Sequence, residues 1–131
     1  MRPTVLIVDD DPTVTDHFSR ILRLEGYDVA AAYGPEQGLS LVEHLHPHAM
    51  VLDLQMRAMD GLELLGRFRT MAHLADVPAV IVTGDYFMDD EIRSRLAELG
   101  AQVEFKPLWV EDLVRVVNEL TARSKVPHAA A

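Results

Sequence analysis

Polar side chains that could handle a phosphoryl group follow four separate apolar runs of the sequence. They are Asp9 and Asp10 after the first run, Asp53 after the third, Thr83 after the fourth and Lys106 after the last. Crowded carboxylates repel one another, and a hard divalent cation such as Mg²⁺ relieves that repulsion. An ammonium and a hydroxyl can bind phosphoryl oxygens, while a carboxylate can act as nucleophile. The set therefore indicates magnesium-assisted phosphoryl transfer.

The apolar runs alternate with longer segments of helical period, and this alternation predicts an α/β fold with a parallel sheet. Five strands are expected, at Val5–Val8, Val29–Ala32, Ala49–Leu52, Ala79–Val82 and Val103–Phe105. The carboxyl ends of parallel strands share one edge of the sheet, and ligands bind there where the strand order reverses. We therefore expect the polar residues that follow the strands to converge.

Helix boundaries are also marked in the sequence. Asp11 and Pro12 are typical of an N-cap and the first position of a helix, and Gly26 and Gly100 stand where helices should end. Each polar strand-end residue taken alone has an ordinary explanation, since Asp often caps a helix and Lys often lies on the surface. Those explanations do not account for the carboxylates, the hydroxyl and the ammonium of one phosphoryl site all occurring at strand ends.

The composition limits the kinds of protein this can be. The chain has 131 residues, of which 49% are hydrophobic, so we expect one domain over residues 1–123 and a flexible tail or linker start over residues 124–131. It has no cysteine, which excludes disulfides and thiolate metal sites. No apolar run is long enough for a signal peptide or a membrane span, so a soluble, cytoplasmic protein is expected. A formal net charge of −9 disfavours direct nucleic-acid binding.

In combination these motifs resemble the receiver domains of two-component response regulators, in particular single receivers of the chemotaxis-regulator type. The resemblance runs from Val5 to about Thr121. It rests on the segments Val5–Pro12, Val51–Met56, Met59–Gly61, Val82–Gly84, Gly100–Ala101 and Phe105–Leu108. It implies a flavodoxin-like sheet of five parallel strands in the order 2-1-3-4-5 with helices on both faces. It also implies a cis peptide bond between Lys106 and Pro107.

The resemblance assigns roles to individual residues. Asp53 would accept a phosphoryl group from a sensor histidine kinase or a histidine phosphotransfer protein, and Thr83 and Lys106 would hold the phosphoryl oxygens. Mg²⁺, for which Mn²⁺ could substitute, would be bound by Asp10, Asp53 and the backbone carbonyl of Gln55, with Asp9 acting through a metal-bound water. The domain would not be an enzyme beyond its own phosphoryl uptake and slow autodephosphorylation.

The implied output is a protein contact rather than a reaction. Phosphorylation would signal to a downstream protein effector or a fused output domain, and neither nucleic acid nor a membrane would be bound directly. The resemblance leaves open a dimer through the face made by the fourth helix, the last strand and the last helix.

The sequence departs from the family pattern at three places. Met56 is followed by Arg57 where the family usually has proline, which should loosen or re-aim this loop without removing the chemistry. Three residues before the lysine, the family commonly has an aromatic whose inward or outward position reports phosphorylation, and this chain has Val103 there. Thr83 and Val103 would belong to the switch region that responds to phosphorylation. Gln55 and Asp85 occupy the positions that tune attack of water on the phosphorylated aspartate.

Two other functions share part of this pattern. Phosphohydrolases of the haloacid-dehalogenase kind also use a strand-end aspartate, Mg²⁺, a hydroxyl and a lysine, but they carry an acid two residues after the nucleophile. Gln55 cannot donate a proton to a leaving group, so ester hydrolysis should fail. A receiver-like module that works without phosphorylation is supported only by Val103.

Three histidines, His44, His46 and His48, lie close together near the middle of the chain. Residues two apart do not share a helix face, and Pro47 should end the helix there. We therefore expect a solvated helix end and no metal cluster.

Overall fold

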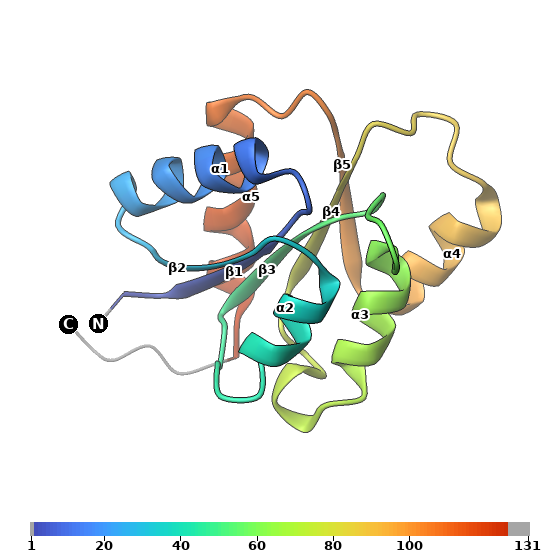
Figure 1. Ribbon diagram of the computed structural model, residues 1–131, viewed down its shortest axis with the longest axis horizontal. Coiled ribbons are helices and arrows are strands. Elements are labelled where there is room, and N and C mark those ends of the chain that lie inside the picture. The colour runs from blue at the N-terminus through green and yellow to red at the C-terminus, as the bar shows by residue number, and fades with distance from the viewer. Residues whose placement is uncertain (1, 126–131) are drawn as a thin grey trace.

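The computed structural model describes residues 2–125, in which five parallel strands form a sheet in the order β2-β1-β3-β4-β5 (Figure 1). The predicted order is therefore confirmed. The elements are β1 (Thr4–Val8), α1 (Pro12–Leu24), β2 (Asp28–Ala32), α2 (Pro35–Leu41), β3 (Ala49–Asp53), α3 (Gly61–Arg69), the short 3-10 helix η1 (Ala72–Leu74), β4 (Ala79–Thr83), α4 (Asp90–Glu98), β5 (Ala101–Phe105) and α5 (Val110–Arg123).

Helices cover both faces of the sheet. Figure 1 shows α1 and α5 on one face and α2, α3 and α4 on the other. Successive strand residues point to opposite faces, so β1 gives Val5 and Ile7 to the α1–α5 layer and Leu6 and Val8 to the opposite layer. All four side chains are essentially fully buried. Burial of each such side chain stabilises the fold by about 1.5–3 kcal/mol, and this core holds the strand ends in place.

The predicted helix caps are present. The Asp11 side chain accepts a hydrogen bond from the Thr13 N–H at 2.9 Å, and Pro12 takes the first helical position of α1. Gly26 and Gly100 follow α1 and α4 with φ values of 98° and 73°, a region that glycine enters without a steric penalty.

Several predicted boundaries differ from the structure. Asp53 and Thr83 are the last residues of β3 and β4 and do not follow them, because their backbones still pair with the neighbouring strands. The strand β5 begins at Ala101, two residues before the expected start. Helix α2 ends at Leu41, so the histidines lie in the loop that follows it.

The expected solvation of these histidines is correct for His44 and His46, which are exposed, but wrong for His48. His48 is only 8% exposed because it directly precedes β3 beside the start of β1. Its Nδ1 accepts a hydrogen bond from the Thr4 N–H at 2.9 Å, and its own N–H donates to the Thr4 carbonyl at 2.7 Å.

The predicted division into residues 1–123 and a tail at residues 124–131 stays a prediction. Helix α5 ends at Arg123, but residue 1 and residues 126–131 lie outside the described part of the chain. Within residues 2–125 no helix combines the length and the apolar character needed to cross a membrane.

Candidate functional site

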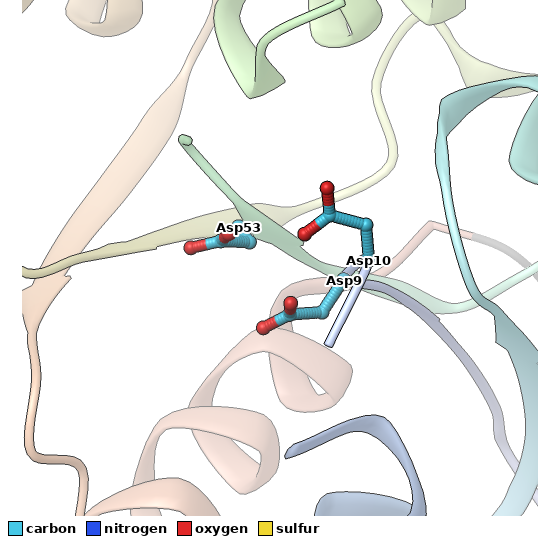
Figure 2. A group of neighbouring side chains, drawn as sticks. All are labelled: Asp9, Asp10 and Asp53. Carbon is cyan, nitrogen blue, oxygen red and sulfur yellow. The ribbon is translucent and has the colours of Figure 1, made fainter. Parts of the chain in front are cut away.

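Three carboxylates lie together beyond the carboxyl ends of β1 and β3. Asp9 and Asp10 follow β1 directly, and Asp53 is the last residue of β3, which pairs with β1 so that Val8 is opposite Leu52. Figure 2 shows the three side chains around one space (Figure 2). One oxygen from each carboxylate lies within 4.8 Å of the others, so this acidic pocket could hold a metal ion.

Local hydrogen bonds hold the turn after β1. The Thr15 hydroxyl, which is buried in the first turns of α1, donates to the Asp9 carbonyl at 2.8 Å. The Asp9 carboxylate in turn accepts a hydrogen bond from the Asp11 N–H at 2.9 Å. The position of Asp9 is therefore set by the start of α1 as well as by β1.

The end of β3 is fixed by a close backbone approach. The Gly61 N–H at the start of α3 donates to the Leu54 carbonyl at 2.8 Å. A Cβ atom at Gly61 would lie 2.3 Å from the Asp53 carbonyl oxygen, which is too close for any other residue without a backbone shift. Glycine at this position therefore lets α3 begin directly against the strand end that carries Asp53.

Lys106 brings a positive charge to the pocket from the end of β5. Its Nζ lies 3.0 Å from Asp53 Oδ1 and 3.7 Å from Asp9 Oδ2. The contact of the Lys106 ammonium with Asp53 is an ion pair. The buried Asp53 Oδ1 accepts no hydrogen bond from the described residues. The Lys106–Pro107 peptide bond is cis, as the resemblance implied.

Burial and neighbouring charges shift the ionisation of these groups. Burial raises the pKa of Asp9 and of Asp53 above 3.8, although Lys106 opposes the shift in both. Burial alone would lower the pKa of Lys106, but the Asp53 and Asp9 carboxylates outweigh it and the pKa is raised. The paired carboxylates therefore keep Lys106 charged, while the two buried aspartates resist ionisation.

Asp10 differs from the other two carboxylates because it pairs with Arg57 and not with Lys106. Its Oδ2 accepts a hydrogen bond from the Arg57 N–H at 2.9 Å and lies 3.4 Å from the Arg57 Nε. The Arg57 N–H is the main cause that lowers the pKa of Asp10. Sequence analysis noted Arg57 as a departure in the loop but missed this pairing.

The remaining candidate residues lie at the same edge or near it. Thr83 ends β4 with its side chain fully buried, and its hydroxyl accepts a hydrogen bond from the Asp85 N–H at 3.0 Å. The Asp85 carboxylate accepts one from the Phe87 N–H at 3.0 Å. Gln55 is exposed in the loop after β3. Among the described residues, Asp85 is not part of the carboxylate cluster.

Comparison with known proteins agrees with this geometry. The model of the response regulator receiver domain family matches residues 5–118. The chain belongs to this family. The match confirms the resemblance and favours a signalling receiver over a phosphohydrolase.

The curated relatives of this receiver domain are longer proteins. The DNA-binding dual master transcriptional regulator RpaA of Synechocystis sp. is 34% identical over 98% of this chain and 53% of its own length. Response regulator MprA of Mycobacterium bovis is 32% identical over 99% of this chain and 55% of its own length. The chain thus spans about half the length of the curated relatives it matches.

Solved structures show the same fold. A CheY-like response regulator receiver domain protein from Methanospirillum hungatei is 28% identical with a TM-score of 0.85, over 93% of this chain and 95% of its own. A putative response regulator from Chloroflexus aurantiacus is 31% identical with a TM-score of 0.83, over 94% of this chain and all of its own.

The loop between β4 and α4 contains an aromatic residue whose contacts sequence analysis missed. Val103 lies in the middle of β5, partly buried against the core on the α4 side and away from the pocket. Tyr86, three residues after Thr83, stacks on Phe105 with ring centroids 5.2 Å apart. Its hydroxyl donates a hydrogen bond to the Lys106 carbonyl. An aromatic in the β4–α4 loop was visible in the sequence, but its contact with β5 depends on the fold.

Proposed function

We propose that Asp53 is the phosphoryl acceptor of this receiver domain. The observation that carries the proposal is the environment of its carboxylate, which is only 5% exposed and has one oxygen without a hydrogen bond from the described residues. A buried carboxylate that is incompletely hydrogen-bonded destabilises a fold unless a ligand completes it. Lys106 at 3.0 Å supplies a positive charge where negative charge would gather during transfer.

The donor set fits a hard divalent cation. Asp9, Asp10 and Asp53 offer only oxygen ligands, and burial of Asp9 and Asp53 makes their mutual repulsion costly. We assign the site to Mg²⁺, which Mn²⁺ could replace, with the backbone carbonyl of Gln55 as a further ligand. The bound ion would neutralise carboxylate and phosphoryl charge.

Different residues of the chain would then carry out different parts of the transfer step. An oxygen of the Asp53 carboxylate attacks the phosphorus of a phosphohistidine on a partner protein. The phosphorus–nitrogen bond breaks, and the imidazole nitrogen keeps the electron pair. Lys106 holds one phosphoryl oxygen by charge, and the Thr83 hydroxyl, which accepts from the Asp85 N–H, can donate its own hydrogen to another.

The partners follow from this chemistry. The donor would be a sensor histidine kinase or a histidine phosphotransfer protein. The recipient of the signal would be a protein effector or an output domain, a proposal supported by relatives about twice as long as this chain. Gln55 and Asp85 adjoin the site in loops after β3 and β4, where they would tune slow autodephosphorylation.

The direct test is phosphoryl uptake from a small donor. Incubation with acetyl phosphate and MgCl₂ should add the mass of one phosphoryl group, and Asp53→Asn should abolish the addition. Asp76→Asn is the matched control, because Asp76 is exposed near the start of β4, at the opposite edge of the sheet, and should label like the unaltered protein.

Intact-mass spectrometry distinguishes the outcomes. Labelling of Asp53→Asn to the same extent as the unaltered protein would contradict the assignment. Sustained release of phosphate from a phosphate monoester in the presence of MgCl₂ would instead favour a phosphohydrolase.

A further inference from the structure

Arg57 makes two contacts with the same oxygen of Asp10, and they differ in kind. The backbone N–H donates to Oδ2 at 2.9 Å, while Nε of the side chain lies 3.4 Å from that oxygen. The Arg57 side chain is 90% exposed, whereas that of Asp10 is 22% exposed. The guanidinium therefore reaches from solvent to the outer side of the acidic pocket.

The pocket thus has one cation on each side. Lys106 approaches Asp53 and Asp9 from β5, and Arg57 approaches Asp10 from the loop after β3. Two positive side chains therefore offset three carboxylates. Lys106 is partly buried and paired twice, but Arg57 is held by a single exposed ion pair.

We infer that the Arg57 guanidinium is a tethered cation that competes with Mg²⁺ for Asp10 and weakens metal binding at this site. The inference rests on the proposed function, because it takes the three carboxylates to be the metal site. A divalent ion bound to Asp10 would repel the guanidinium, so the ion pair must be weakened or broken on loading. The exposed side chain can turn into solvent, where its charge is well hydrated.

The two contacts have opposite consequences for metal binding. The N–H hydrogen bond is neutral and orients the Asp10 carboxylate, and any residue except proline would keep it. Only the side chain carries a charge that opposes a second cation. A substitution that removes the charge and keeps the N–H therefore isolates the competition.

The experiment compares Mg²⁺ dissociation constants measured by calorimetry at low ionic strength. Arg57→Gln should bind Mg²⁺ about threefold more tightly than the unaltered protein, the size expected for loss of an exposed ion pair. Arg57→Lys keeps the charge and should bind as weakly as the unaltered protein. Arg67→Gln removes the same charge from the last turn of α3, far from Asp10, and should leave the constant unchanged.

The outcomes separate this inference from the proposed function. An equal or larger dissociation constant in Arg57→Gln would overturn the inference while leaving the metal site in place. Tighter binding in both Arg57→Gln and Arg67→Gln would also overturn it, because net charge and not the contact would be the cause. Failure of the unaltered protein to bind Mg²⁺ would overturn the inference and the metal site together.

Discussion

Polar groups at the two ends of the sheet are satisfied to different degrees. At the amino end, the half-buried Arg69 donates to the carbonyls of Leu74 and Val77 at 2.7 Å each and to that of Leu99 at 2.9 Å. At the carboxyl end, three carboxylates crowd together, and the Asp53 Oδ1 accepts no hydrogen bond from residues 2–125. At the amino end, a cation thus supplies hydrogen bonds to carbonyls of the chain itself. At the carboxyl end, the crowded carboxylates favour binding of an external ligand.

The contrast places the well-satisfied polar groups and the proposed phosphoryl site at opposite ends of the sheet. Satisfied buried polar groups rigidify a fold, and unsatisfied ones are retained where a ligand completes them. Removal of Arg69 at one end and of the Asp53 charge at the other should therefore change the free energy of unfolding with opposite signs in the absence of metal. Four predictions test this contrast, and they are ordered from the largest expected effect to the smallest.

Removal of Arg69 should lower the free energy of unfolding more than the other changes. Arg69→Ala removes the Arg69 donor from three carbonyls, of which that of Leu74 keeps only a 3.4 Å bond from the Val77 N–H, and we expect the free energy of unfolding to fall by about 3 kcal/mol. Arg67→Ala, on the exposed side of the same helix, should change it by less than about 0.5 kcal/mol. Urea denaturation of both variants checks the prediction, and equal losses would show that the carbonyl contacts contribute nothing.

Addition of Mg²⁺ should stabilise the carboxyl end. At one hundred times its dissociation constant, Mg²⁺ should raise the free energy of unfolding by about 2.7 kcal/mol through mass action. Asp10→Ala should reduce this gain, because it removes one of the clustered carboxylates. Thermal unfolding in MgCl₂ and in KCl of matched ionic strength separates binding from screening. The same Mg²⁺ response in Asp10→Ala would rule out Asp10 as a ligand.

The close approach at Gly61 should be intolerant of a side chain. Gly61→Ala forces the Asp53 carbonyl and α3 apart, and we expect a loss of about 2 kcal/mol together with weaker Mg²⁺ binding. Gly66→Ala is the matched control, because Gly66 lies in the same helix and a Cβ atom there would meet nothing within 4 Å. It should gain about 0.5–1 kcal/mol. Denaturant unfolding that gives both variants the same sign would contradict the strand-end packing.

The smallest effect is a pH dependence without metal. The pKa values of Asp9 and Asp53 are raised above the ordinary value of 3.8. These groups therefore contribute stability below pH 3.8, and that contribution is lost as the pH rises through their pKa values in the folded state. Asp53→Asn, which mimics the protonated form, should therefore gain stability relative to the unaltered protein between pH 4 and pH 7. Asp10, whose pKa is lowered, contributes the opposite trend below pH 3.8.

Melting temperatures of both proteins across this range check the sign. A stability difference that does not change with pH would show that Asp53 ionises as easily in the fold as in the unfolded chain.

Much of the fold could be predicted because its signals are local. Apolar runs of strand length, the Asp11 cap and Gly100 each depend on neighbouring residues. The extent of α2 and the burial of His48 could not be predicted, because they depend on how the loop after α2 packs beside β1. Polar residues of a loop look alike in sequence whether they face solvent or another strand.

The candidate site divides in the same way. The sequence by itself determined which chemical groups follow which strands, since parallel strands bring their carboxyl ends to one edge. Only the tertiary structure decided how those groups pair: Lys106 with Asp53, Arg57 with Asp10, and Tyr86 with the Lys106 carbonyl. These pairings join loops that are far apart in sequence. Their distances depend on packing of the whole sheet, which no local pattern records.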